Sequence, residues 1–252
     1  MQTPRDWDAS TYNRVSGPLE AMGREVLDRL TLAGDERVLD AGCGSGRVTR
    51  ALLDRLPGGR VIAVDGSPAM IEQARAALPP QVELRVADLL ELEVEEPVDA
   101  ILSTATFHWV ADHDALFARL LAALRPGGEL VAQCGGEGNV AAVKAAGHAV
   151  GRREPFAPHL AGWVEDWNFQ TPEATEARLR AVGFSDVWCW RTEVRVEPED
   201  PAAYLSAICL GSFLERLPEE LRGPFVEAAL AELDAPFGLD YVRLNILARR
   251  PS

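Results

Sequence analysis

A glycine-rich turn between a strand-like and a helix-like segment constrains the fold of this chain more than any other feature. Residues 38–49 read VLDAGCGSGRVT, so an apolar stretch holding Asp40 is followed by Gly42, Gly44 and Gly46 and then by helix-forming residues. This pattern predicts a strand that turns tightly into a helix and leaves its backbone open to a ligand.

A second apolar run, VIAVD at residues 61–65, ends in an acidic residue. Asp65 is therefore expected at the carboxyl edge of the neighbouring strand, where a carboxylate can accept hydrogen bonds from both hydroxyls of a ribose. Together the turn and Asp65 predict a nucleotide-type binding site.

The form of the turn narrows the class of ligand. A dinucleotide fold uses G-x-G-x-x-G, in which a third small residue lets the helix pack on the strand and the helix N-terminus holds a pyrophosphate. Arg47 occupies that third position here, and the pattern is D-x-G-x-G-x-G instead. The carboxylate of Asp40 would repel a pyrophosphate but suits a cation. These residues favour S-adenosylmethionine, which carries an ammonium and a sulfonium, and leave a nicotinamide-dependent oxidoreductase as a remote alternative.

Apolar runs alternate with amphipathic segments along most of the chain, which is typical of βαβ units that feed a parallel sheet. Strands are predicted near residues 37–41, 60–65, 82–86, 98–103, 129–134, 185–196 and 241–249. In the second half, helices are predicted at 172–181, 201–216 and 218–234. The sequence therefore predicts an α/β fold with additional helices before the last strand.

Composition excludes several classes of function. The 252 residues carry a formal charge of −14, so nucleic acid would be repelled and is not an expected partner. The first residues lack the apolar core of a signal peptide and no stretch is apolar enough to span a bilayer, so a cytoplasmic protein without a membrane partner is expected. No signal for an oligomeric state is present.

The cysteines indicate neither a metal site nor a disulfide framework. They are widely spaced and include no C-x-x-C pair. We expect no bound metal and four reduced, mostly buried thiols at Cys43, Cys134, Cys189 and Cys209.

The glycine turn and Asp65 are followed by Asp88, by FHWV at 107–110 and by RPGG at 125–128. With these motifs the chain resembles the class I S-adenosylmethionine-dependent methyltransferases. The resemblance implies a Rossmann-like, seven-stranded sheet that is mostly parallel, with an antiparallel last strand and a helical cap. It also implies N-terminal lid helices at 1–30, an S-adenosylmethionine-binding core at 31–135, a cap or loop insertion at 136–170, and the rest of the core at 171–252 with a helical insertion at about 198–237.

Three further features narrow the resemblance. An N-terminal Trp7-Asp8 is followed by Tyr12, the run from Phe107 continues through Asp112 to His113, and helices precede the last strand. These features are similar to the trans-aconitate methyltransferases and related small-molecule carboxyl methyltransferases. A tricarboxylate should be held by several cations, yet residues 198–240 contain only two arginines. The residues therefore argue against trans-aconitate itself.

The resemblance also implies roles in binding the cofactor. Asp40 and the three glycines hold its amino-acid end, and Asp88 accepts from the adenine amino group while the backbone N–H of Leu89 donates to the ring. Helix capping by Asp88 is the alternative. The remaining candidates are Met70 against adenine, with core packing as the alternative, Ser103 beside the methionine moiety, and Arg14 as a partner for a carboxylate of cofactor or acceptor.

The candidates for the reacting site are His108, Trp109 and Tyr12. Methyl transfer is an in-line displacement, and a small-molecule acceptor must be held on the far side of the methyl group. A carboxylate, with a pKa near about 4, is already ionised, whereas a phenol near about 10 must lose a proton. The favoured reaction is transfer to a carboxylate oxygen with release of S-adenosylhomocysteine. The alternative is methylation of a phenol, amine or carbon with His108 as the general base.

Overall fold

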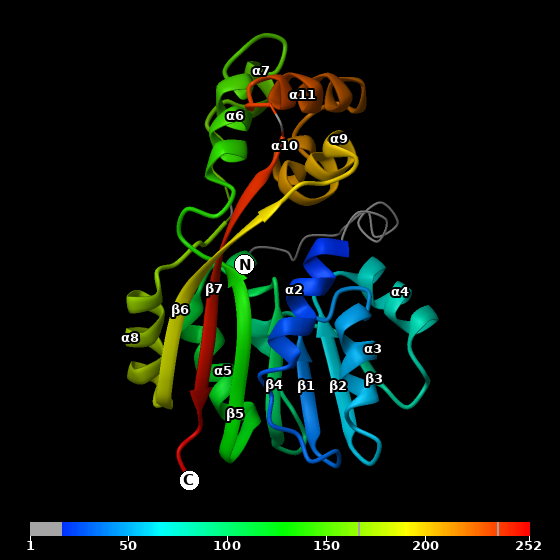
Figure 1. Ribbon diagram of the computed structural model, residues 1–252, viewed down its shortest axis with the longest axis vertical. Coiled ribbons are helices and arrows are strands. Elements are labelled where there is room, and N and C mark those ends of the chain that lie inside the picture. Colours follow the sequence, from blue (N-terminus) through cyan, green and yellow to red (C-terminus); the bar gives the residue numbers. More distant parts are fainter. Residues whose placement is uncertain (1–16, 166, 236) are drawn as a thin grey trace.

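The computed structural model describes residues 17–165, 167–235 and 237–252. They form one seven-stranded sheet in the order β3-β2-β1-β4-β5-β7-β6 (Figure 1). The strands are β1 (Arg37–Ala41), β2 (Arg60–Asp65), β3 (Glu83–Val86), β4 (Val98–Thr104), β5 (Leu124–Gly135), β6 (Ser185–Val196) and β7 (Leu239–Arg249). Strands β1 to β5 pair in parallel, and β7 runs antiparallel to both β5 and β6. The predicted fold class, including the antiparallel last strand, is confirmed.

Helices cover both faces of the sheet, which explains why its central strands are apolar along their whole length. On one face lie α2 (Gly17–Leu27), α3 (Arg47–Asp54) and α4 (Pro68–Ala77), and on the other lie α5 (His113–Ala123) and α8 (Pro172–Val182). Adjacent residues of β1 serve the two sides, since Val38 packs with the first group of helices and Leu39 with the second. This burial fixes the register of the strands and the position of their carboxyl ends.

A group of cap helices lies beyond the carboxyl edge of the sheet (Figure 1). Its members are α6 (Ala141–Gly151), α7 (Ala157–Leu160), α9 (Pro201–Tyr204), η3 (Leu205–Cys209), α10 (Gly211–Leu214) and α11 (Glu219–Ala231). They share an apolar cluster in which Phe213 stacks on Phe225 with ring centroids 5.5 Å apart. Residues 141–160 and residues 201–231, which are distant in the sequence, therefore pack together over one edge of the sheet.

The helix predicted at 201–216 is not continuous, and that prediction is wrong in detail. Its middle is the π-helical turn η3, closed by a 2.7 Å hydrogen bond from the Leu210 N–H to the Leu205 carbonyl. Both leucines are fully buried. In an α-helix, residues five apart point about 140° away from each other, so the wider turn allows both to enter the apolar cluster.

All four cysteines are buried, as the sequence predicts, and none forms a disulfide. Within the part of the chain that the structure describes, no helix is long and apolar enough to cross a membrane.

Candidate active site

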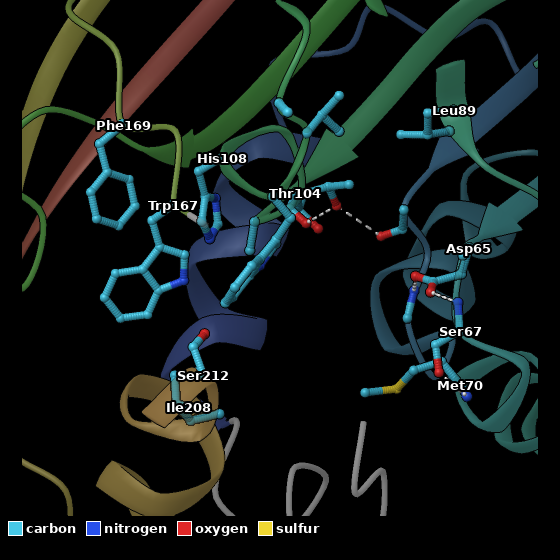
Figure 2. A pocket seen from close by; sticks show the side chains of 18 of the residues that line it. Asp65, Ser67, Met70, Leu89, Thr104, His108, Trp167, Phe169, Ile208 and Ser212 are labelled. Carbon is cyan, nitrogen blue, oxygen red and sulfur yellow. Dashed lines mark hydrogen bonds between the residues drawn. The ribbon is translucent and has the colours of Figure 1, made fainter. Parts of the chain in front are cut away.

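A cavity of about 770 Å³ opens between the carboxyl edge of the sheet and the cap helices. One side is built by the turns that follow β1, β2 and β3. The other is built by the short helix η2 (Phe107–Trp109), the segment 167–169, the cap and β7. Figure 2 shows the two sides facing each other, with Asp65 and Met70 on one and His108 and Trp167 on the other.

The glycine turn brings the ends of β1 and β4 together. Gly42 has φ 85°, and a Cβ built there would lie 2.1 Å from the Thr106 Oγ1, which itself donates to the Gly42 carbonyl. A side chain at Gly46 would lie 2.7 Å from the Leu78 Cδ1. At Gly44, by contrast, a Cβ would meet no atom within 4 Å, and this residue lines the cavity. Two of the glycines thus allow close packing, while the one between them leaves the turn open to a ligand.

Asp65 ends β2 and is tied to the glycine turn. Its Oδ2 accepts from the Gly44 N–H at 2.8 Å, and its Oδ1 accepts from the Ser67 N–H at 2.9 Å. Burial raises the pKa of Asp65, and these two bonds oppose the rise. Because each carboxylate oxygen has a further lone pair, this cavity-lining residue can still accept two hydroxyls.

Asp40 lies behind the turn. Its Oδ2 accepts from the Thr49 hydroxyl at 2.6 Å, whereas its buried Oδ1 accepts no hydrogen bond from the described residues. Burial, reinforced by the charge of Asp65, raises the pKa of Asp40 to about 6. A buried acceptor of this kind is normally satisfied by a water or a bound group.

Met70, Asp88 and Leu89 all line the cavity. The Asp88 Oδ1 accepts from the Leu90 N–H at 2.9 Å, so this residue does cap the short helix η1 (Leu89–Glu91). Its Oδ2 makes no hydrogen bond with the described residues and can accept from a ligand. The capping and ligand-binding interpretations of Asp88 are therefore compatible.

Ser103 and Gly46 support the walls and do not line the cavity. The Ser103 hydroxyl is buried and donates to the Ala41 carbonyl at 2.6 Å. Since side chains alternate along a strand, the neighbouring Thr104 faces the cavity instead.

His108 has a defined hydrogen-bonding state. The Gly135 N–H donates to its Nδ1 at 3.2 Å, so Nδ1 is unprotonated and the proton of the neutral ring lies on Nε2. Burial, followed by the charges of Arg243 and His113, lowers its pKa well below the usual value. His108 is therefore a neutral residue with an N–H to offer at Nε2.

Aromatic rings surround His108. Trp109 meets Trp167 edge to face at 5.7 Å, and Phe169 lies 5.5 Å from the His108 ring. The segment carrying Trp167 and Phe169 is fixed to η2, because the Asn168 N–H donates to the His108 carbonyl at 2.8 Å. In the sequence these residues appear only as a cluster of aromatic side chains, and no local motif indicates that they form the wall opposite the glycine turn.

The comparisons with known proteins agree with this geometry. A family profile described as a methyltransferase domain matches residues 38–128. A trans-aconitate 2-methyltransferase of Methylobacterium nodulans is 31% identical over 97% of this chain and 98% of its own length. Another, from Methylobacterium radiotolerans, is 31% identical over 98% of this chain and 99% of its own. This chain belongs to the trans-aconitate 2-methyltransferase family.

Solved structures of other methyltransferases share the fold of this methyltransferase. A Haemonchus contortus phosphoethanolamine N-methyltransferase 2 in complex with S-adenosyl-L-methionine matches 97% of this chain and 57% of its own, with a TM-score of 0.63 and 19% identity. A geranyl diphosphate C-methyltransferase from Streptomyces coelicolor matches 91% of this chain and 75% of its own, with a TM-score of 0.54 and 20% identity.

The protein is an S-adenosylmethionine-dependent methyltransferase, and the family excludes the alternative of a nicotinamide-dependent oxidoreductase. The glycine-turn side of the cavity fits this cofactor. It offers an open backbone at Gly44, carboxylates at Asp65 and Asp88, and the unsatisfied Oδ1 of Asp40 behind them. Carboxylates on this side suit a ligand with a net positive charge. Among the described residues, no cluster of His, Cys, Asp or Glu could hold a metal ion.

Arg243 is the cavity residue that the sequence indicated most weakly. Alternate positions along the strand predicted near 241–249 place Tyr241, Arg243 and Asn245 on one face, and no motif marks them as site residues. In the structure Tyr241 and Arg243 line the cavity, and Asn245 is buried beneath them. The two remaining predicted residues, Tyr12 and Arg14, lie outside the described residues.

Proposed function

We propose that this methyltransferase transfers the methyl group of S-adenosylmethionine to a carboxylate oxygen of a small organic acid. The observation that carries the proposal is the hydrogen bond from the Gly135 N–H to the His108 Nδ1. It makes the other ring nitrogen a donor, which is what an anionic oxygen needs.

The same bond argues against His108 as a general base. To accept a proton at Nε2, the neutral ring would have to carry its proton on Nδ1, where two N–H groups would face each other at Gly135. A phenol or ammonium acceptor needs a base, whereas a carboxylate is ionised at neutral pH. The donor state of His108 therefore favours an acid as the acceptor.

The names of the relatives support an acid. The two Methylobacterium enzymes are named for trans-aconitate, a carboxylic acid, and their similarity to this chain extends over nearly the whole of both sequences. The aligned region therefore includes the segments that build the cavity wall opposite the glycine turn. The acceptor of this protein shares at least its reacting group with trans-aconitate.

The cofactor roles follow from the groups on each wall. Asp65 accepts hydrogen bonds from the ribose hydroxyls. Asp88 accepts one from the adenine amino group, the Leu89 N–H donates to the adenine ring, and Met70 packs against that ring. The backbone of Gly42 and Gly44, with Asp40 behind it, holds the amino-acid end. Gly46 and Ser103 hold these walls in place. The roles of Tyr12 and Arg14 as a lid over the site remain predictions.

The protein's own contribution to the rate is alignment and exclusion of water. The cofactor supplies an activated methyl group. Trp109, Trp167 and Phe169 form an apolar wall on the acceptor side, and Trp109 is the candidate that would contact the acceptor most directly. His108 would hold the attacking carboxylate by its Nε2–H.

The first test is transfer of labelled methyl from S-adenosylmethionine to two pools, one of carboxylic acids and one of phenols and amines. We expect base-labile methyl esters in the acid pool. Label confined to the phenol and amine pool would reject the carboxylate reaction and leave the family assignment intact.

Variants of His108 test its role as a donor. In His108→Gln the amide can still donate, so we expect kcat/KM for the acid within about 5-fold of wild type. His108→Phe removes the donor and should lower kcat/KM for the acid by about 10- to 100-fold, the range expected for the loss of a hydrogen bond to a charged group. Because the pKa of His108 is low, the wild-type rate should be flat from about pH 6 to 8. A rate that rises with a histidine-like titration, with the Gln variant as inactive as the Phe variant, would identify a base instead.

A further inference from the structure

A buried arginine closes the acceptor side of the cavity. Arg243 lies on β7, lines the cavity and is only 3% exposed. Its Nε donates to the Gln133 Oε1 on β5 at 3.1 Å. That bond is made to the neutral oxygen of an amide.

Arg243 adjoins His108 through one residue of β5. Gly135 donates its N–H to the His108 Nδ1 and is the register partner of Arg243 in the β5–β7 pair. The charge of Arg243 accordingly contributes to the lowered pKa of His108. A carboxylate held by the His108 N–H would therefore lie in the field of a buried cation.

The orientation of Gln133 is fixed from behind. Its Nε2 donates to the Asn245 Oδ1 at 2.7 Å, and the same oxygen accepts from Arg29 at 2.7 Å. The Asn245 Nδ2 donates to the Thr192 hydroxyl at 3.1 Å. Because the amide oxygen of Asn245 receives two donors, Gln133 must turn its NH₂ toward Asn245 and its oxygen toward Arg243. Gln133 is 4% exposed and Asn245 is completely buried, so no bulk water substitutes for these bonds.

The other groups on the acceptor side are mostly apolar. Val140, Trp167, Phe169 and Ile208 line this side, and its polar members besides His108 and Arg243 are Asn139, Ser212, Tyr241 and the exposed cap residues Glu215 and Arg216. The second arginine among the described lining residues, Arg216, is exposed at the cap. A tricarboxylate needs several buried cationic partners, and among the residues that the structure describes this wall buries one, Arg243.

We infer that Arg243 determines acceptor specificity by holding the reacting carboxylate, and that the acceptor is a monocarboxylic acid with an apolar remainder. Gln133 and Asn245 are positioning residues that set the angle of the guanidinium. This inference rests on the proposed carboxylate methylation and deepens it.

The acceptor class is tested with a panel of acids on the wild-type protein. The panel contains aryl-substituted and medium-chain monocarboxylates, their dicarboxylate counterparts and trans-aconitate. We expect kcat/KM for the best monocarboxylate to exceed that for trans-aconitate by at least about 10-fold. Trans-aconitate as the best acceptor would overturn the inference.

The role of Arg243 is tested by three substitutions. Arg243→Met should raise the acid KM by at least about 30-fold while the dissociation constant of S-adenosylmethionine changes by less than about 2-fold. Arg243→Lys keeps the positive charge but loses the two parallel N–H donors of the guanidinium, and it should give an intermediate KM. This variant provides the test if Arg243→Met does not fold. Arg249→Met is the matched control, because Arg249 lies on the same strand, half-exposed, paired with Glu129. It should leave both constants unchanged.

Gln133→Glu separates positioning from packing. The new carboxylate keeps the size of the side chain but competes with the acceptor carboxylate for the Arg243 guanidinium, so the acid KM should rise by about 10-fold or more with cofactor affinity unchanged. Unchanged acid KM in Arg243→Met or in Gln133→Glu would overturn the inference while leaving carboxylate methylation intact. A wild-type protein that methylates only phenols and amines would instead overturn the proposed function itself.

Discussion

At the scale of single residues, Asp40 shows how a group proposed to bind the cofactor can lower the stability of the ligand-free protein. Its pKa of about 6, against an ordinary 3.8, means that the folded state holds the proton more tightly than the unfolded state. The free energy of unfolding therefore falls as the pH rises from about 4 to 6, by about 3 kcal/mol for this residue, and stays lower above that range.

Asp40→Asn removes this buried charge. We expect the ligand-free variant to be more stable than wild type at pH 7.5, by up to about 3 kcal/mol, and no more stable near pH 4. Its affinity for S-adenosylmethionine should fall, because the anion behind the turn is lost. Urea unfolding at both pH values and calorimetric titration check the two effects. A variant that is less stable at pH 7.5, or that binds the cofactor as wild type does, would contradict this account of Asp40.

At the scale of secondary-structure elements, the glycine turn combines a packing requirement with an opening. At Gly42 the backbone has φ 85°, and the methyl group of Gly42→Ala would lie 2.1 Å from the Thr106 Oγ1. The methyl group of Gly44→Ala would meet no atom within 4 Å. We expect Gly42→Ala to lower the free energy of unfolding by about 3 kcal/mol or more and Gly44→Ala by about 1 kcal/mol. Urea denaturation of the ligand-free variants measures the difference. Equal losses would mean that strain in φ, and not the contact with Thr106, decides the residue at position 42.

Elements defined by local patterns were predictable from the sequence, and contacts between distant elements were not. The glycine turn and Asp65 follow from short motifs at the ends of apolar runs. The bond between Arg243 and Gln133 joins residues 110 positions apart and exists because β7 inserts between β5 and β6. The turn η3 was missed because its widened geometry serves the apolar cluster of the cap and has no local signal.

At the scale of the whole molecule, the charge of −14 acts differently on the two ligands. S-adenosylmethionine carries a net positive charge and is attracted, whereas the carboxylic acid that we propose as the acceptor is repelled until it reaches Arg243. Salt screens both effects, since the screening length is about 10 Å at 0.1 M.

We therefore expect opposite salt dependences. Raising the ionic strength from about 20 to 300 mM should increase the dissociation constant of S-adenosylmethionine and decrease the KM of the acid, each by a few-fold. Adenosine, which is uncharged, serves as the control and should bind equally at both salt concentrations. Isothermal titration and initial rates give the two values. Constants that move in the same direction would show that the net charge does not govern access to the site.

The four buried cysteines lie in four different parts of the fold, with Cys43 in the glycine turn, Cys134 in β5, Cys189 in the edge strand β6 and Cys209 in the cap. Burial raises the pKa of Cys134, Cys189 and Cys209 to about 12. Only a thiolate is alkylated rapidly, so each thiol becomes reactive only when the structure around it opens. The four thiols can therefore report on local unfolding. The order in which they are modified gives the order in which the glycine turn, the centre of the sheet, the edge of the sheet and the cap unfold.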